Sequence, residues 1–187
     1  MKSVIFTIIV LIALSFRAQA QPPAPVDLGI QNISQQTPVW CWAAVAQQII
    51  YKINGPGGTP HQCQLVAAAF NMAPQYCCQV PTPCMTTGSL QQIQGLIAYF
   101  GGHWSTLALP ANPMSVYQTL ASGKAIIMAV QSSPYSGHVV VIRGMAWAQT
   151  AMGLQPVLYV NDPMAYFTQP IPFLNLSQYW SAAIVVY

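Results

Sequence analysis

The sequence predicts an α+β fold, because segments with helical periodicity precede segments that are typical of strands. Apolar residues recur at helical spacing from Trp42 to Ile53, and a second helical pattern covers residues 89–100. From Lys124 onward the chain changes to short β-branched or aromatic runs that are bounded by turn residues. Helices first and strands afterwards are typical of the α+β class.

An export signal followed by one domain is the predicted organisation of the chain. An apolar run covers residues 4–14, and the sequence AQA at residues 18–20 places small residues at the two positions that a signal peptidase reads. Residues 1–20 are therefore predicted to be a signal peptide, and residues 21–187 a single domain. The apolar run is too short to span a membrane, so we expect a secreted or periplasmic protein without stable membrane association after signal removal.

The predicted mature chain carries very few charges. Three cations and two acids lie outside the predicted signal, namely Lys52, Lys124, Arg143, Asp27 and Asp162. A surface so poor in Lys and Arg cannot neutralise many phosphates, so we expect no nucleic-acid partner. The near absence of acids also makes the retention of Asp162 informative.

The number of cysteines, five, is odd, and in an exported protein an odd number leaves one thiol unpaired. Four of them cluster between residues 63 and 84, so Cys41 is the expected free thiol. Adjacent Cys77 and Cys78 rarely pair with each other, so Cys63 and Cys84 are each expected to bond to one of them. The sequence does not decide which. A four-cysteine zinc site is the alternative, although the spacing contains no C-x-x-C pair.

The elements are expected in a definite order along the chain. An extended lead-in over residues 21–34 packs on the surface or edge of the domain, and a helix that ends at Asn54 follows, with Gln47 and Gln48 free to face water. The other expected helices cover residues 61–71, 89–100 and 112–123, a disulfide-stapled loop covers residues 75–88, and the expected strands cover residues 125–130, 138–142, 157–160 and 183–187.

Cys41 lies between two tryptophans, in or beside the first turn of the helix that ends at Asn54. There the unpaired amide groups and the positive end of the helix dipole favour an anion, so a thiolate would be stabilised and could act as a nucleophile. The side-chain amide of Gln35, six residues upstream, can donate a hydrogen bond to an oxyanion that forms when the thiolate attacks a carbonyl. The alternative is that Cys41 packs in the core as a small apolar residue.

His138 is the histidine with the context of a site residue. It opens an alternating apolar strand after a Ser-Gly pair, which holds the side chain at the rigid rim of a sheet. Asp162 follows the next expected strand, and strand ends commonly display site residues. A structural histidine and a turn-capping aspartate before proline are the alternatives. His61 and His103 are expected to be structural or exposed.

Together these motifs resemble the papain-like cysteine peptidases, and within them the bacterial leader-peptidase-like group and the secreted avirulence-type proteases of plant-pathogenic bacteria. The motifs are Q-x-x-x-x-x-C-W at residues 35–42, G-H-V-V-V-I-x-G at residues 137–144 and V-N-D-P at residues 160–163. The resemblance implies a papain-like fold, with the cysteine helix in an N-terminal helical half and an antiparallel β half after it. Unlike papain, this chain approaches its cysteine through Thr-Pro-Val-Trp, without a glycine-rich segment.

The resemblance also implies roles that the chemistry supports. Cys41 would be the nucleophile, His138 its base and later the acid for the leaving amine, Asp162 the group that orients the imidazole, and Gln35 an oxyanion donor. Neither a metal nor another cofactor is implied. Papain uses Asn as the third residue and the leader-peptidase type uses Asp, so Asn161 remains an alternative to the favoured Asp162. The expected partner is a polypeptide substrate, cleaved by a monomer.

Two other functions fit the same residues. A Cys and His pair also serves amidases that act on peptidoglycan cross-links and transamidases, because the pair alone does not select the acyl acceptor. The second is a non-catalytic module that binds a peptide in an aromatic-rich cleft.

Overall fold

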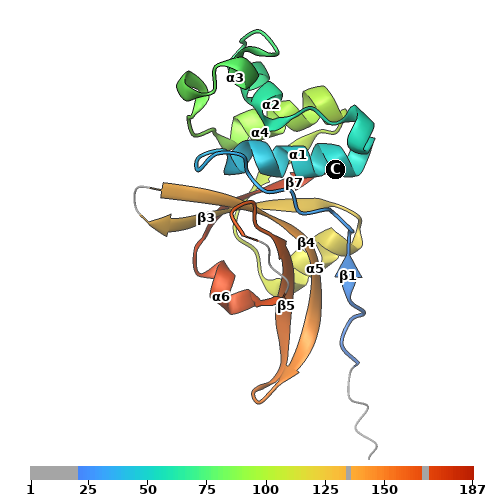
Figure 1. Cartoon of the computed structure of the whole chain (residues 1–187). Helices are drawn as coiled ribbons and strands as arrows, with labels where there is room; N and C mark the ends of the chain where they lie inside the picture. The colour runs from blue at the N-terminus through green and yellow to red at the C-terminus, as the bar shows by residue number, and fades with distance from the viewer. Residues whose placement is uncertain (1–20, 134–135, 166–168) are drawn as a thin grey trace, which may run out of the picture.

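Most of the helices lie in the first half of the chain and most strands of an antiparallel sheet in the second, so the predicted α+β class is confirmed (Figure 1). The computed structural model describes residues 21–133, 136–165 and 169–187. The predicted signal peptide, residues 1–20, lies outside the described residues. Within these ranges, no helix has both the length and the apolar character needed to cross a membrane.

Six α-helices and seven strands are found in the described ranges, and each series is numbered in chain order. The helices are α1 Cys41–Asn54, α2 Gln62–Ala69, α3 Tyr76–Gln79, α4 Leu90–Leu96, α5 Pro113–Ala121 and α6 Phe173–Ser177. The strands are β1 Val26–Asp27, β2 Ser105–Ala108, β3 Ala125–Ser133, β4 Ser136–Thr150, β5 Gly153–Asn161, β6 Ile171–Pro172 and β7 Trp180–Val186. Short 3₁₀ turns at Pro56–Gly58 and Thr82–Cys84 lie between helices, and a π-helical turn at Ile97–Gly101 continues α4.

Local sequence signals set several helix ends. α1 begins after Trp40 and ends at Asn54, and the φ of 70° at the next residue, Gly55, suits a residue without a side chain. Ser89 caps α4: its hydroxyl oxygen accepts a hydrogen bond from the Gln92 backbone amide, and the two residues form a capping box. At the start of α5 the Asn112 side-chain oxygen accepts a hydrogen bond from the Ser115 backbone amide at 2.9 Å, and Pro113 occupies the first turn.

The sheet runs in the order β2-β7-β3-β4-β5-β6 with antiparallel neighbours, and β1 pairs separately with β4. β4 pairs first with β3 and then with β5, and its register with β5 shifts between Ile142 and Gly144. A Cβ at Gly144 would lie 2.4 Å from the Val26 carbonyl oxygen. β1 therefore lies this close to β4 because Gly144 has no side chain.

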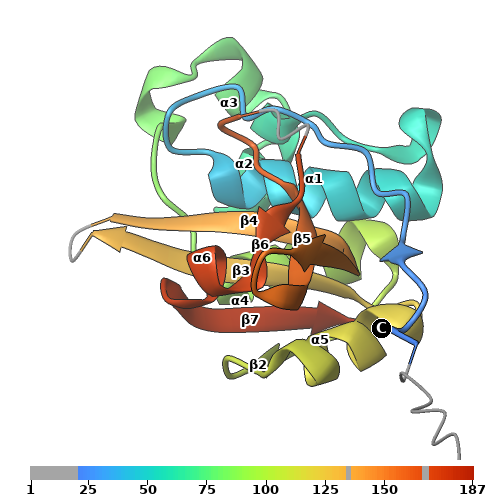
Figure 2. The ribbon, with the colours of Figure 1, turned by 90° about the horizontal axis from the view of Figure 1, so that it is seen from below.

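Helices cover both faces of the sheet (Figures 1 and 2). On one face α1, α2 and α4 form a core with Ile127, Val141 and Ile184 of the sheet. On the other face α5 and α6 pack against a second core that includes Ile126 and Met128. Successive residues of β3 thus point into opposite cores, as the alternation of side chains along a strand requires.

The expectation that Gln47 and Gln48 face water is wrong. Gln47 is 8% exposed and Gln48 is fully buried. Their side-chain amides donate to backbone carbonyls at the helix surface, Gln47 to Pro60 at 2.8 Å and Gln48 to Ile33 at 3.1 Å. Burial of these amides is stable because loop carbonyls replace the water that they lose.

Candidate active site

Cys41 is the first residue of α1, and its thiol is free and half-buried. The two flanking tryptophans fix this end of the helix. The indole of Trp40 donates to the Cys84 carbonyl at 2.9 Å, and the indole of Trp42 donates to the Thr86 carbonyl at 3.2 Å. The loop around Cys84 therefore holds the backbone on both sides of Cys41.

Two disulfides staple that loop, Cys63–Cys78 and Cys77–Cys84. This resolves the pairing that the sequence left open. It also rules out the four-cysteine zinc site, because bonded sulfurs supply no thiolate ligands. Cys84 is buried with an exposure of 1%, so the bridge that carries the Trp40 contact is part of the helical core.

His138 and Asp162 meet across the start of β4. Val141 of β4 pairs with Asn161 of β5, so the residue after β5 lies beside the first residues of β4. The His138 Nε2 atom lies 2.7 Å from the Asp162 Oδ1 atom, and the two side chains are 18% and 14% exposed. Because a carboxylate only accepts, Nε2 is the donor in this bond.

The two candidates for the third residue have different partners. The Asn161 side chain is buried and donates to the Ile30 carbonyl at 2.8 Å. Asp162 faces His138 and, with the same Oδ1 atom, also accepts the Met164 backbone amide at 2.8 Å. The turn-capping contact and the histidine contact, weighed as alternatives from the sequence, thus coexist.

The pKa of His138 is raised to about 9. Burial alone would lower it, because a buried imidazolium loses hydration, but the hydrogen bonds to Asp162 and to Cys41 and the negative charges of both groups outweigh burial. Since Nε2 is engaged by Asp162, the nitrogen that remains for Cys41 is Nδ1. Because its pKa is about 9, His138 keeps its cationic form through neutral pH.

A cleft of about 670 Å³ contains both Cys41 and His138. Its other walls come from the start of α4 and from β3, β4 and β7; among its lining residues His138 is the one whose side chain can carry a positive charge. Gly88 is needed at the rim, because a Cβ there would lie 2.2 Å from the Trp42 ring. The residues of α4 and β3 in this cleft carried no signal in the sequence, since only the fold brings them beside Cys41.

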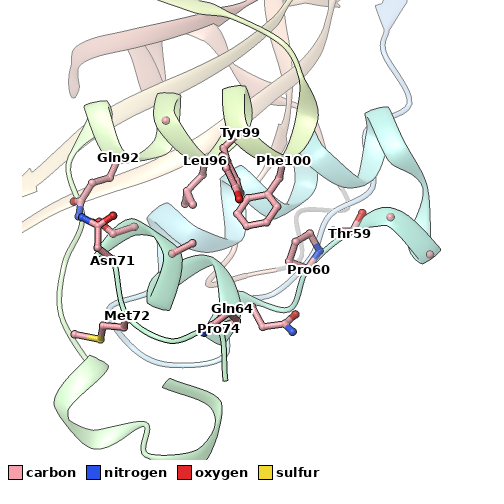
Figure 3. A pocket seen from close by; sticks show the side chains of 15 residues that line it. Thr59, Pro60, Gln64, Asn71, Met72, Pro74, Gln92, Leu96, Tyr99 and Phe100 are labelled. Atoms are coloured by element: carbon pink, nitrogen blue, oxygen red, sulfur yellow. The ribbon is translucent and has the colours of Figure 1, made fainter. Parts of the chain in front are cut away.

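A larger hollow of about 950 Å³ lies elsewhere, between α2, α4 and the loop before α2 (Figure 3). Leu96, Tyr99 and Phe100 line one side of it, and the other side includes Pro60 and Gln64. It has no histidine, cysteine or charged side chain among its lining residues. The reactive groups therefore belong to the smaller cleft.

Gln35 lies in the segment that leads into α1. Its side-chain Nε2 donates to the Thr37 carbonyl at 2.7 Å, and its backbone amide donates to the Pro163 carbonyl at 2.9 Å, in the turn that follows Asp162. His138 thus contacts both Cys41 and Asp162, whereas Gln35 joins the same region through its backbone. His61 and His103 are exposed, away from this cleft.

An α+β fold that places a helix-terminal cysteine against a histidine from the sheet defines the class of papain-like cysteine peptidases. Over residues 24–175 the chain matches the family described as papain-like cysteine protease AvrRpt2, and it belongs to that family. A solved C39-like peptidase from Bacillus anthracis has a similar fold, with a TM-score of 0.59 and 12% identity over 88% of this chain and 98% of the other. No curated protein matches the sequence.

Proposed function

We propose that the chain is a secreted peptidase that hydrolyses peptide bonds with Cys41 as nucleophile and His138 as its acid and base. The observation that carries this proposal is the contact of a free thiol with a histidine whose other nitrogen is held by a carboxylate. A nucleophile, a base and a group that orients the base are the parts that thiol catalysis requires.

In the proposed reaction the proton of Cys41 resides on Nδ1 of His138, and the thiolate attacks the carbonyl carbon of the substrate. The carbonyl π electrons move to oxygen and form a tetrahedral oxyanion. The oxyanion electrons then re-form the carbonyl as the C–N bond breaks, the electron pair of that bond takes the proton from His138, and the amine leaves while the acyl group remains on sulfur as a thioester. His138 then removes a proton from water, whose oxygen displaces the thiolate and releases the acid.

Asp162 and Gln35 support this chemistry in different ways. The Asp162 carboxylate holds the imidazole by Nε2, so that Nδ1 faces the sulfur, and it stabilises the imidazolium. Gln35 supplies an oxyanion donor from the second N–H of its amide, since the first is bonded to Thr37. The backbone amide of Cys41 is a further donor, because the first amides of a helix have no partner within it.

The cleft around Cys41 supports the proposed substrate class, and other features of the chain support the proposed location. A polypeptide fits a cleft that is lined by apolar and uncharged polar residues together with His138. Export is supported by the predicted signal peptide and by two disulfides, which suit an oxidising compartment.

The proposal is tested by incubating the protein with a denatured polypeptide and, separately, with purified cell-wall sacculi. Wild-type protein should cleave the polypeptide, whereas Cys41→Ala and His138→Ala should not, and His103→Ala should keep full activity as the matched histidine control. Release of fragments from the sacculi alone would replace the peptidase with a cell-wall amidase. Undiminished cleavage by Cys41→Ala would reject the nucleophile.

A further inference from the structure

Gln62, the first residue of α2, is a buried polar residue outside the cleft. Its side chain has no solvent exposure, although α2 lies at the surface of the helical layer. Each polar atom of its amide has a partner. Oε1 accepts the Gln36 backbone amide at 2.8 Å, and Nε2 donates to the Ser34 carbonyl at 2.8 Å and to the Gln47 Oε1 atom at 3.0 Å.

These contacts flank a single residue, Gln35, in the segment that leads into α1. The carbonyl before it and the amide after it are both bound by the same Gln62 side chain. Gln47, which supports Gln62, is itself held through its Nε2 by the Pro60 carbonyl. The backbone on both sides of Gln35 is thus fixed from the helical layer by two buried side-chain amides, those of Gln62 and Gln47.

The opposite side of Gln35 is fixed by the strand layer. Its backbone amide donates to the Pro163 carbonyl at 2.9 Å, directly after Asp162. The Gln35 side chain, by contrast, has one hydrogen bond, to Thr37, and its Oε1 atom is buried without a partner among the described residues. The backbone contacts therefore set the direction of this amide more than its side-chain contacts do.

We propose that Gln62 is a positioning residue that acts through Gln35: by holding the peptide groups on both sides of Gln35, it aims the free N–H of the Gln35 amide at the oxyanion. This inference rests on the proposed function, in which Gln35 is an oxyanion donor. An oxyanion donor stabilises the transition state only when it is aimed before the charge develops. Loss of Gln62 should accordingly lower kcat and leave KM nearly unchanged.

The test compares Gln62→Met with Gln64→Met in the full chain. Methionine keeps the length of glutamine but donates and accepts no amide hydrogen bond. Gln64 lies on the same helix and caps it by accepting the His61 backbone amide, and within the described part of the chain it makes no hydrogen bond to residues 34–36. We expect Gln62→Met to lower kcat on the order of tenfold, as displaced catalytic groups do, with KM within about twofold, and Gln64→Met to leave kcat unchanged.

A double-mutant cycle with Gln35→Ala separates this role from a general loss of stability. If Gln62 acts through Gln35, Gln62→Met should cost little further kcat once Gln35 is alanine, because residues that act as a unit are not additive. Gln62→Asn, which keeps an amide one methylene shorter, provides a second variant if Gln62→Met does not fold. It should show the same pattern with a smaller loss.

The outcomes distinguish the two proposals. A full tenfold loss from Gln62→Met in the Gln35→Ala background, or an equal loss in Gln64→Met, would overturn the positioning role while leaving the proposed mechanism intact. So would a fall in kcat for Gln35→Ala with none for Gln62→Met. Wild-type kcat in Gln35→Ala would instead reject the role of Gln35 in the proposed function, and the inference with it.

Discussion

The Asp162 Oδ1 atom lies 2.7 Å from the His138 Nε2 atom and is itself fixed by the Met164 backbone amide at 2.8 Å. The carboxylate is therefore oriented by its own turn before it orients the imidazole. This arrangement leaves Nδ1 for Cys41, and it favours the charged form of His138.

The alkaline limit of activity should report the pKa of His138. Its pKa is raised from 6.5 to about 9, so the imidazolium that donates a proton to the leaving amine is present below about pH 9 and is lost above it. We expect kcat/KM to fall as the pH rises through that value. The profile is measured from pH 6 to 10.5 with a peptide substrate. A decline centred near pH 6.5 would contradict an ion pair between His138 and Asp162.

Asp162→Asn should move that alkaline limit to lower pH. Removing the carboxylate charge removes a cause of the raised pKa of His138, while the burial that lowers the pKa remains. An opposite charge at this distance is worth roughly one to three pKa units. Asp27→Asn is the matched control, because Asp27 pairs with Arg143 away from the cleft. An unchanged limit in Asp162→Asn would show that Asp162 does not set the charge of His138.

The Cys77–Cys84 disulfide should matter for activity as well as for stability. Cys84 provides the carbonyl that anchors the Trp40 indole beside Cys41. Replacing both cysteines by alanine should cost about 2–3 kcal/mol for so short a loop and should also lower kcat. Denaturant unfolding and initial rates are measured on the same preparations.

The other disulfide provides the control for that prediction. Cys63→Ala with Cys78→Ala removes the bridge between α2 and α3, whose cysteines do not accept the indole hydrogen bonds of Trp40 and Trp42. This variant should lose stability but keep its kcat. Equal losses of kcat in the two double variants would mean that the Trp40 anchor has no particular role.

Gly88→Ala should impair the cleft, and Gly95→Ala should not. A Cβ at Gly88 would lie 2.2 Å from the Trp42 ring, so the indole beside Cys41 must shift. A Cβ at Gly95, within α4, meets no atom within 4 Å, and alanine there should stabilise the helix by roughly 0.5–1 kcal/mol. Thermal unfolding and kcat/KM are compared for the two variants. A Gly88→Ala protein with normal kcat/KM would show that the indole position is not critical.

Where local signals were strong, the sequence was sufficient to predict the fold. The predicted helix end at Asn54 is the observed end of α1, and the predicted starts at residues 89 and 112 lie one residue before the observed starts of α4 and α5. The β-branched runs likewise correspond to the central strands β3, β4, β5 and β7. These features are encoded within a few residues, which is why one sequence reveals them.

Elements that depend on distant partners were not predicted. β2 and β6 are edge strands of four and two residues, too short for an alternating pattern, and pairing with β7 and β5 defines them. α6 was missed for a similar reason, since its single buried residue is Phe173. The second half of β4 was also missed, because its partner β5 extends it beyond the apolar run.

The candidate site likewise combines residues that local motifs predicted with contacts that only the fold creates. The sequence singled out Cys41, His138 and Asp162, and the fold places them in contact; their catalytic roles remain predictions. Burial of Gln47, Gln48 and Gln62 was not foreseen, because glutamine at the surface and glutamine paired with a loop carbonyl look alike in a sequence.

The central claim is that the Cys41 thiol is activated by His138. It is tested most directly by labelling the native protein with a thiol-directed epoxide at neutral pH and mapping the modified peptide by mass spectrometry. The account predicts one equivalent of label on Cys41 in wild type and in His103→Ala, and a strongly reduced rate in His138→Ala. Labelling of Cys41 at the same rate in His138→Ala, or no labelling of Cys41 in wild type, would contradict it.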